Sequence, residues 1–428
     1  MSNRISFYTL GCRLNQSETA VIQNSFEASG YSVVDFDQPA DIVVVNTCTV
    51  TENGDADTRR LVNKINRINP QARIALIGCQ AQTQKGKLAE LTNVRWIVGN
   101  ARKFELVDIL KEFNNKTSPQ VIAPIIPRGS FTIPVAGVDR QHTRANLKIQ
   151  DGCDFFCSFC EIPYARGRAR SREFSDILKE AVILAQAGHK ELVVTGINVG
   201  TYCNNGKTFL DVIDALTEIK NIARIRISSI EPTTIPIELI ERMGKNPKLC
   251  RYLHIPLQSG SNPVLKSMKR KYTTEEFCDF IHTAHNKIPE LCIGTDVIVG
   301  FPGETDNLFS ETEELLRCLP FSYFHVFSYS ERTMAKSRHL AEKVPLKAIQ
   351  ERSQILRDLS NRKRRLFHQS LLGTTQTVLC EQKKNEHWHG WTDHYVRVKI
   401  KSNNELENSL VRVTLKSIAD NTVVGKLS

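Results

Sequence analysis

Three closely spaced cysteines are the residues of this chain whose types and spacing most clearly indicate chemistry. Cys153, Cys157 and Cys160 lie in the stretch IQDGCDFFCSFCEIP, with the spacing C-x3-C-x2-C. Thiolates at this spacing surround one small loop, where together they can bind one metal centre. Structural zinc sites and ordinary iron–sulfur clusters have four protein ligands, so one coordination position is left for another ligand.

Two metal centres are compatible with this motif. A zinc ion completed by a histidine is one interpretation, although no histidine lies between Cys153 and the helix expected from Ser175 to Gly188. A four-iron cluster is the other, with three irons bound by thiolates and the fourth iron without a protein ligand. That open iron can bind a substrate or cofactor directly.

Three further cysteines share one position relative to the expected strands. Cys12 ends FYTLGC, Cys48 ends DIVVVNTC, and Cys79 ends RIALIGC. Ligands of open parallel sheets bind outside the carboxyl ends of the strands, so these cysteines are predicted to converge on one edge. Three unrelated buried thiols are the alternative, because cysteine is among the most buried residue types. The remaining cysteines match no ligand spacing and are expected to be structural: 203, 250, 278, 292, 318 and 380.

Basic residues gather in two stretches of a chain whose net charge is +11. One stretch follows the closely spaced cysteines and holds Arg166, Arg168, Arg170 and Arg172. The other is the run Arg362, Lys363, Arg364 and Arg365. A solvated surface explains either stretch alone. Two stretches, one of them beside a metal site, indicate a polyanionic partner such as nucleic acid.

The elements that must position these residues fall into an α/β arrangement of three units. Residues 1–115 alternate short apolar runs with helical stretches, which predicts an open parallel sheet with helices on its faces. Residues 116–139 contain four prolines and are expected to form an extended linker. The expected strands are Ile5–Leu10, Ile42–Asn46, Ile74–Ile77 and Arg95–Val98, and the expected helices are Ser17–Ser29, Asp55–Asn69 and Thr83–Leu91.

The second and third units have different patterns. Residues 140–370 contain six β-branched runs separated by stretches long enough for helices, which predicts a partial (βα)6 barrel of TIM type. Residues 371–428 contain short strands and polar turns, typical of a small antiparallel β-barrel. The expected strands are Asn146–Gln150, Glu191–Thr195, Arg224–Ile230, Tyr252–Pro256, Thr295–Val299 and Tyr323–Ser328, then Thr377–Cys380, Tyr395–Lys401 and Leu410–Ser417.

Composition indicates a protein that does not enter membranes. No stretch approaches the roughly 20 apolar residues of a membrane span. The N-terminal sequence MSNRISFYTLGC lacks the pattern of a secretory signal. We therefore expect a cytoplasmic protein. We also expect it to be a monomer. Its 12 cysteines are then thiols or metal ligands rather than disulfides.

The motifs resemble those of a known enzyme superfamily. A C-x3-C-x2-C motif that opens a six-strand partial barrel is similar to that of radical S-adenosylmethionine enzymes. The resemblance extends to methylthiotransferases, which have an N-terminal three-cysteine domain, this barrel, and a C-terminal RNA-binding TRAM barrel. Motifs match in order along essentially the whole chain: TLGCRLNQSE, NTCTVT, IGCQAQ, KIQDGCDFFCSFC, IPYARGRARSR, HIPLQSGS and GTDVIVGFPGET.

The start of the chain further resembles one branch of that family. GCRLNQSE is similar to enzymes that methylthiolate N6-threonylcarbamoyladenosine beside the tRNA anticodon. The isopentenyladenosine branch usually carries Gln-Met where Arg13 and Leu14 stand. Alternative acceptors are isopentenyladenosine in tRNA and a ribosomal-protein aspartate. A non-enzymatic, metal-containing RNA-binding protein is the more distant alternative.

The resemblance implies two [4Fe-4S] clusters, one on each cysteine triplet. The cluster on Cys153, Cys157 and Cys160 would bind S-adenosylmethionine through its open iron and cleave it to a deoxyadenosyl radical. The cluster on Cys12, Cys48 and Cys79 would supply sulfur for C2 of the adenine. One S-adenosylmethionine would be the methyl donor and a second the radical source. The implied partners are the tRNA anticodon stem-loop, an external electron donor and an external sulfur donor.

Residues at the later strand ends are candidate contacts to S-adenosylmethionine, although each also has an ordinary structural explanation as a cap, a loop hydrogen bond or a core residue. These candidates are Phe159, Thr195, Gly196, Asn198, Ser229, Glu231, His254, Gln258 and Asp296. Both basic stretches could neutralise phosphates of the anticodon loop. Trp391, with its aromatic neighbours, could stack on unpaired bases or belong to the core of the C-terminal barrel.

Overall fold

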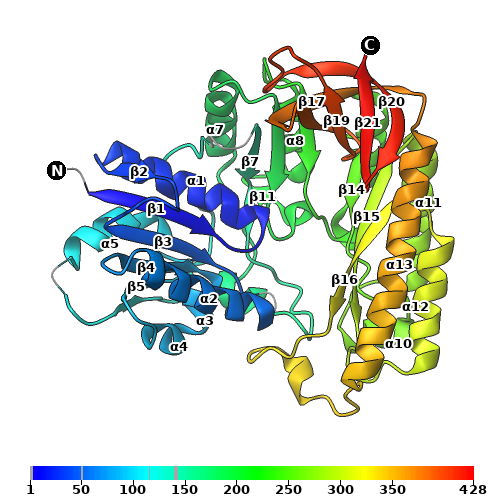
Figure 1. Cartoon of the computed structure of the whole chain (residues 1–428). Helices are drawn as coiled ribbons and strands as arrows, with labels where there is room; N and C mark the ends of the chain where they lie inside the picture. Colours follow the sequence, from blue (N-terminus) through cyan, green and yellow to red (C-terminus); the bar gives the residue numbers. More distant parts are fainter. Residues whose placement is uncertain (1–2, 50–51, 115, 139–142) are drawn as a thin grey trace.

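The computed structural model describes residues 3–49, 52–114, 116–138 and 143–428 as three units in contact (Figure 1). The chain passes from an N-terminal α/β unit through a central arc of strands to a small C-terminal barrel. This arrangement confirms the predicted α/β class with a terminal β-barrel. Among the described residues, none of the helices combines the length and the apolar character needed to cross a membrane.

The N-terminal unit is a six-stranded parallel sheet in the order β2-β1-β3-β4-β5-β6. Its strands are β1 (Arg4–Thr9), β2 (Ser32–Val34), β3 (Ile42–Thr47), β4 (Arg73–Gly78), β5 (Val94–Val98) and β6 (Gln120–Ile122). Every residue of β3 is buried, because helices cover both faces of the sheet. The helices on one face are α1 (Arg13–Ala28) and α5 (Leu106–Glu112), and those on the other are α2 (Glu52–Ile68), α3 (Cys79–Thr83) and α4 (Lys85–Ala89).

Three local predictions in this unit are wrong. The expected linker 116–139 contributes β6, which pairs with β5 at the edge of the sheet. An edge strand tolerates the preceding Pro119, since proline removes an amide donor that an edge does not need. Strand β2 was not expected. The single helix expected from Thr83 to Leu91 is instead two short helices that break at Gln84.

The central unit is an open arc of six parallel strands, as predicted for a partial barrel. Two three-stranded sheets, β7-β10-β13 and β14-β15-β16, are connected by the isolated parallel bridges Ile225–Leu249 and Ser229–His254. The strands are β7 (Arg144–Lys148), β10 (Glu191–Thr195), β13 (Arg224–Ile227), β14 (Tyr252–His254), β15 (Cys292–Val299) and β16 (Tyr323–Ser328). Short pieces flank them: β8 (Gln150–Asp151), β9 (Arg170–Ser171), β11 (Cys203–Asn204) and β12 (Lys207–Thr208).

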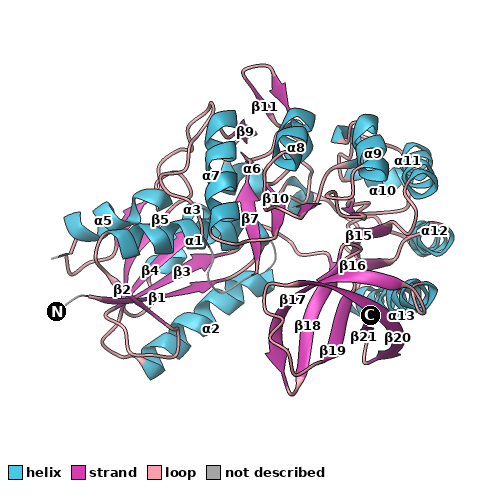
Figure 2. Ribbon diagram, turned by 90° about the horizontal axis from the view of Figure 1, so that it is seen from above, coloured by secondary structure: helices cyan, strands magenta, loops and turns pink. Residues whose placement is uncertain are grey.

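Helices pack along the outside of this arc (Figure 2). They are α7 (Phe174–Gln186), α8 (Phe209–Thr217), α9 (Ile237–Lys245), α10 (Asn262–Ser267), α11 (Thr274–Lys287), α12 (Asp306–Cys318) and α13 (Leu346–Ser370). Thr273 caps α11 and Thr305 caps α12 through side-chain acceptors, as such residues do at helix starts. Helix α13 continues from the arc into the C-terminal barrel (Figure 1). The short helix α6 (Ile162–Arg166) follows the closely spaced cysteines.

The C-terminal barrel is closed, with the strand order β17-β18-β19-β21-β20. Its strands are β17 (Thr375–Lys384), β18 (His387–Thr392), β19 (Arg397–Lys401), β20 (Leu410–Ala419) and β21 (Thr422–Leu427). The prediction of an all-antiparallel barrel is corrected at one pair, because β19 and β21 run parallel where the barrel closes. Two strands, β18 and β21, were not expected from the sequence.

Candidate cluster sites and the cavity between them

The loop after β7 holds the closely spaced cysteines in a fixed turn. Gly152 has φ +71°, and a Cβ atom there would lie 2.0 Å from the carbonyl oxygen of Arg168. Only glycine therefore fits immediately before Cys153. The amide of Phe155 donates to the Cys153 sulfur, and the amide of Ile162 donates to the Cys160 sulfur, each at 3.5 Å. The two amide donors therefore fix the orientation of the Cys153 and Cys160 sulfur atoms within the loop.

The surroundings of these sulfur atoms keep the thiols protonated when no metal is bound. Burial raises the pKa of the Cys153 thiol to about 11 and also raises that of Cys160. The free thiols are therefore protonated at neutral pH, and a bound metal must displace those protons. The guanidinium of Arg270 donates to the Cys157 sulfur at 3.2 Å and to Glu231, which adds a positive charge beside the ligand set.

The second triplet, Cys12, Cys48 and Cys79, lies at the carboxyl ends of three neighbouring strands of the N-terminal sheet. Strands β1, β3 and β4 are neighbours, with Thr9 opposite Asn46 and Thr47 opposite Gly78. Cys12, Cys48 and Cys79 follow these strand ends at the start of α1, after β3 and at the start of α3. A Cβ atom on Gly11 would lie 2.8 Å from the Cys48 sulfur, so the loop before Cys12 packs directly on Cys48.

The sulfur atoms of neither cysteine triplet are gathered as closely as the ligands of one bound zinc ion. Thiolates on one tetrahedral zinc lie about 3.8 Å apart when Zn–S bonds are about 2.3 Å. Within the described part of the chain, the three-residue group whose ligand atoms lie within 4.8 Å of one another is His254, Asp296 and His325, and neither cysteine triplet forms such a group. Both triplets supply the soft thiolate ligands that iron–sulfur clusters require.

A buried ionic network joins the two cysteine regions. Glu18 of α1 accepts from Lys148 at 2.7 Å and from Arg166 at 2.9 Å, and it also pairs with Lys103. Lys148 and Arg166 both contact Asp151, two residues before Cys153. Burial opposes ionisation of Glu18, yet the three surrounding cations hold its pKa well below the ordinary value. The network therefore fixes the N-terminal unit on the central arc.

The prediction that four arginines after the cysteines meet RNA is wrong for Arg166 and Arg172. Each is 1% exposed, Arg166 in the network just described and Arg172 in ion pairs with Asp176 and Glu180. Arg170 is mostly buried against Phe131. Arg168 remains open to solvent, with half of its side chain exposed beside Asp154.

The four expected RNA contacts of the second basic stretch also divide into exposed residues and residues engaged within the protein. Arg362 and Arg365 are exposed on α13. Lys363 instead donates to the carbonyl of Leu319, and Arg364 lies over the ring of Tyr323.

Trp391 is engaged within the protein, which favours the core alternative over stacking on RNA. Its ring stacks on Tyr395 at 4.5 Å with an interplanar angle of 15°. Arg144 lies over the same indole, whose N–H donates to Glu381 at 2.9 Å. Trp388 and His394 are buried, so much of this aromatic group belongs to the protein interior.

A cavity of about 410 Å³ lies where the three units meet. The N-terminal unit contributes Cys12 and Arg13, and the C-terminal barrel contributes Tyr395. The central arc lines it with five predicted cofactor contacts: Thr195, Gly196, Ser229, His254 and Asp296. This cavity therefore touches a cysteine of the second triplet and the carboxyl ends of the central strands.

A smaller cavity of about 180 Å³ adjoins the loop that holds Cys153, Cys157 and Cys160, called the radical-type loop after the family that its spacing resembles. Phe159, Gln258 and Asp296 line it, so Asp296 borders both cavities. Two predicted contacts lie outside them. Asn198 is buried and accepts from Thr234 at 2.9 Å, and Glu231 is the partner of Arg270.

Several residues of the site were not expected from the sequence. Arg270 and His325 lie far along the chain from the cysteines. The fold brings Arg270 against the Cys157 sulfur, and it brings His325 into the cavity that Cys12 also lines. Gln150 accepts from the amides of Ile197 and Asn198 at 2.9 Å and so fixes the turn after β10. Its place at the carboxyl end of the expected strand Asn146–Gln150, where the sites of such barrels lie, was the available signal for that role.

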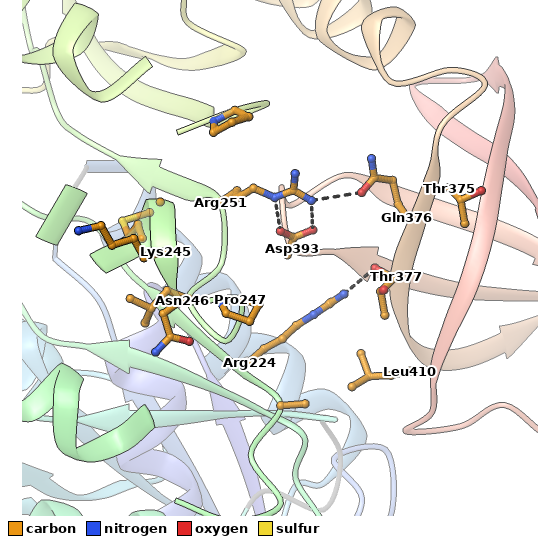
Figure 3. Close-up of a pocket in the computed structure, with 15 residues that line it drawn as sticks. Arg224, Lys245, Asn246, Pro247, Arg251, Thr375, Gln376, Thr377, Asp393 and Leu410 are labelled. Atoms are coloured by element: carbon orange, nitrogen blue, oxygen red, sulfur yellow. Dashed lines mark hydrogen bonds and ion pairs between the residues drawn. The ribbon is translucent and has the colours of Figure 1, made fainter. Parts of the chain in front are cut away.

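The opposite end of the central strands carries a domain junction rather than a second site (Figure 3). A cavity of about 590 Å³ lies between the arc and the C-terminal barrel. Figure 3 shows Arg251 paired with Asp393 and Arg224 directed at Thr377 across this junction. These arginines are occupied by contacts between the units.

Comparisons with known proteins agree with this geometry. The model of the radical SAM superfamily matches residues 147–316, and that of uncharacterized protein family UPF0004 matches residues 4–99. The solved radical S-adenosylmethionine methyltransferase TsrM from Kitasatospora setae has a similar fold. It shows a TM-score of 0.58 at 17% identity, covering 77% of this chain and 75% of that one.

Two curated relatives match nearly the whole chain. The threonylcarbamoyladenosine tRNA methylthiotransferase MtaB of Bacillus subtilis (strain 168) is 36% identical over 420 residues, 96% of this chain and 93% of its own length. A tRNA-2-methylthio-N(6)-dimethylallyladenosine synthase of Dehalococcoides mccartyi is 31% identical over 98% of this chain and 97% of its own length. The chain therefore belongs to the radical S-adenosylmethionine family of tRNA methylthiotransferases.

Proposed function

We propose that this enzyme methylthiolates C2 of N6-threonylcarbamoyladenosine beside the tRNA anticodon. One observation carries the proposal: a single cavity is bordered by Cys12 of the N-terminal triplet and by the carboxyl ends of the strands that follow the radical-type cysteines. A base bound there lies between two sites with separate tasks. The acceptor is taken from the B. subtilis relative, whose name specifies threonylcarbamoyladenosine.

Each cysteine triplet would hold one [4Fe-4S] cluster, giving two in all. When bound, these groups would supply a deoxyadenosyl radical from S-adenosylmethionine and the sulfur to be transferred. The protein's own residues orient the reactants and limit access of water. Phe159 and Gln258 line the cavity beside the radical-type loop, and Thr195, Gly196 and Asp296 face the larger cavity, where S-adenosylmethionine and the base would meet.

The anticodon stem-loop would approach exposed cations of the central unit. Arg168 beside the radical-type loop, and Arg362 and Arg365 on α13, are open to solvent and able to contact phosphates. An electron donor and a sulfur donor complete the set of proposed partners. The enzyme acts as a monomer in this proposal.

Nucleoside mass spectrometry of tRNA from a deletion strain tests the acceptor. Loss of the methylthio group from threonylcarbamoyladenosine, restored by the wild-type gene but not by Cys12→Ala or Cys153→Ala, is the expected result. Loss of methylthio-isopentenyladenosine would assign the other tRNA acceptor. Unchanged tRNA with a lost modification on a ribosomal protein would reject a tRNA acceptor.

Metal analysis of anaerobically purified protein tests the cofactors independently. About eight irons and eight sulfides are expected for the wild type, falling to about four in either cysteine variant. Zinc in place of iron, or no loss of iron in Cys12→Ala, would contradict the two-cluster proposal.

A further inference from the structure

Arg13 brings into the cavity of about 410 Å³ a cation for which the described residues supply no carboxylate partner. It is the first residue of α1, directly after Cys12, and it lines the cavity. One guanidinium nitrogen, Nη2, donates to the hydroxyl of Tyr395. The other, Nη1, is buried, and no group in the described part of the chain forms a hydrogen bond with it. A buried charged donor without a partner is costly, so a ligand is expected to supply the acceptor.

The other charged groups of the cavity do not compete for that role. Among the described residues that line it, Arg13 is the one lysine or arginine. Asp296 is occupied by His254, whose Nε2 lies 3.0 Å from its carboxylate. Burial lowers the pKa of His325, which keeps that ring neutral at pH 7. An anionic group entering the cavity therefore meets one permanently charged cation, that of Arg13.

A second unsatisfied group lies in the same cavity. The hydroxyl of Ser228, just beyond the end of β13, is buried and has no hydrogen-bond partner in the described structure. An arginine with a free N–H and a free hydroxyl together match a carboxylate, which accepts several hydrogen bonds and pairs well with a guanidinium. An apolar substituent would leave both groups unpaired.

We propose that Arg13 binds the carboxylate on the N6 substituent of the acceptor adenosine, with Ser228 as a second contact. Arg13 thereby selects a carboxylate-bearing adenosine over one with an apolar substituent. This inference rests on the proposed function, because it requires that the base occupy this cavity. The selection arises from the energetic penalty of burying an unpaired guanidinium against the wrong substituent.

Binding measurements on the reconstituted enzyme without reductant test this selection separately from turnover. The probes are three anticodon stem-loops that carry N6-threonylcarbamoyladenosine, its methyl ester, or isopentenyladenosine. Fluorescence anisotropy gives each dissociation constant. The wild type is expected to bind the acid about 10- to 100-fold more tightly than the ester, the range of one or two charge-assisted hydrogen bonds. A wild-type ratio near one would overturn the inference without any variant.

Variants then test whether Arg13 causes the difference in affinity between the acid and the ester. Arg13→Gln is expected to bring the acid-to-ester ratio close to one while affinity for the ester stays the same. Arg13→Lys should keep part of the ratio, since it keeps the charge but loses the planar fork. Iron content equal to that of the wild type checks that Cys12 still binds its cluster. Arg168→Gln, an exposed cation, is the control: it should weaken all three RNAs alike and leave the ratio unchanged.

The outcomes separate this inference from the proposed function. A full acid-to-ester ratio in Arg13→Gln overturns the role of Arg13, whatever the tRNA analysis shows. Equal weakening of all three RNAs by Arg13→Gln would assign Arg13 to a backbone phosphate and also overturn it. Loss of methylthio-isopentenyladenosine in the deletion strain would instead reject the proposed acceptor itself.

Discussion

The guanidinium of Arg270 lies 3.2 Å from the sulfur of Cys157, one of the three closely spaced cysteines. The same nitrogen lies 3.2 Å from the carboxylate of Glu231. The Arg270 side chain is 2% exposed and lies between α10 and α11. A buried cation that donates to a ligand sulfur stabilises additional negative charge on a bound cluster. With the proposed cluster bound, Arg270 would therefore be a positioning and electrostatic residue, held in place by Glu231.

Replacing Arg270 should make the radical-type cluster harder to reduce. In a Cys12→Ala background, which isolates that cluster, Arg270→Met is expected to lower the reduction potential, with Arg270→Lys intermediate. A redox titration followed by electron paramagnetic resonance measures it. Lys271→Met is the matched control, because Lys271 is the adjacent cation and lies over Phe155 instead of a sulfur. A potential that stays the same or rises in Arg270→Met would contradict this role.

Gly11 should be required for the N-terminal cluster site. Gly11 and Gly30 both have positive φ angles, +92° and +84°, so alanine strains the backbone by about 1–2 kcal/mol at either position. Only at Gly11 would an added Cβ atom collide with Cys48; an added Cβ atom on Gly30 would meet no group beyond its chain neighbours within 4 Å. Gly11→Ala is therefore expected to lose about half of the bound iron. Gly30→Ala should retain all of it, and equal iron in both variants would refute the packing argument.

Local sequence was sufficient to predict the strand ends and therefore the cysteine sites of the N-terminal unit. Parallel neighbours bring their carboxyl ends to one edge, so the expectation for Cys12, Cys48 and Cys79 needed only the strand assignments. The short edge strands β2 and β6 were missed because three residues carry little periodicity, and because Pro119 argues against a strand unless its edge position is known.

Long-range pairing explains the residues that sequence reasoning missed or misassigned. The segment around Arg166 predicts an RNA contact, but Arg166 instead pairs with Glu18, which is 148 residues away in the chain. Arg13 faces Tyr395 of the C-terminal barrel, 382 residues along the chain. Such contacts depend on how the units dock, and the pattern within one element carries no information about that docking.

Glu18 should be essential for docking of the N-terminal unit. Glu18→Gln leaves Lys103, Lys148 and Arg166 facing Asp151 alone, so buried positive charge loses its main compensation. Breaking one partner of such a buried network costs about 3–5 kcal/mol. Urea unfolding should show this loss. Glu311→Gln, at an exposed position of α12, is the control and should change stability by less than about 0.5 kcal/mol. Similar midpoints for both variants would show that the network contributes little.

Protonation of Asp393 at acid pH should weaken the attachment of the C-terminal barrel to the central unit. Arg251 donates to the Asp393 carboxylate at 2.7 Å across the junction shown in Figure 3. Burial opposes ionisation, but His394 and Arg251 together hold the pKa of Asp393 at about 2, below its unfolded value near 3.9. The stabilisation is therefore complete above about pH 4 and is lost as pH falls towards about 2.

Asp393→Asn should remove this pH dependence. At pH 7 the variant is expected to be less stable by about 1–3 kcal/mol, and the difference from the wild type should shrink as pH falls from about 4 to 2. Thermal unfolding of metal-free protein at pH 7, 4 and 2.5 measures it. Asp57→Asn is the control, since Asp57 pairs with Arg60 on the surface and such pairs contribute little. A penalty for Asp393→Asn that stays constant from pH 7 to 2.5 would contradict the titration of Asp393 in this range.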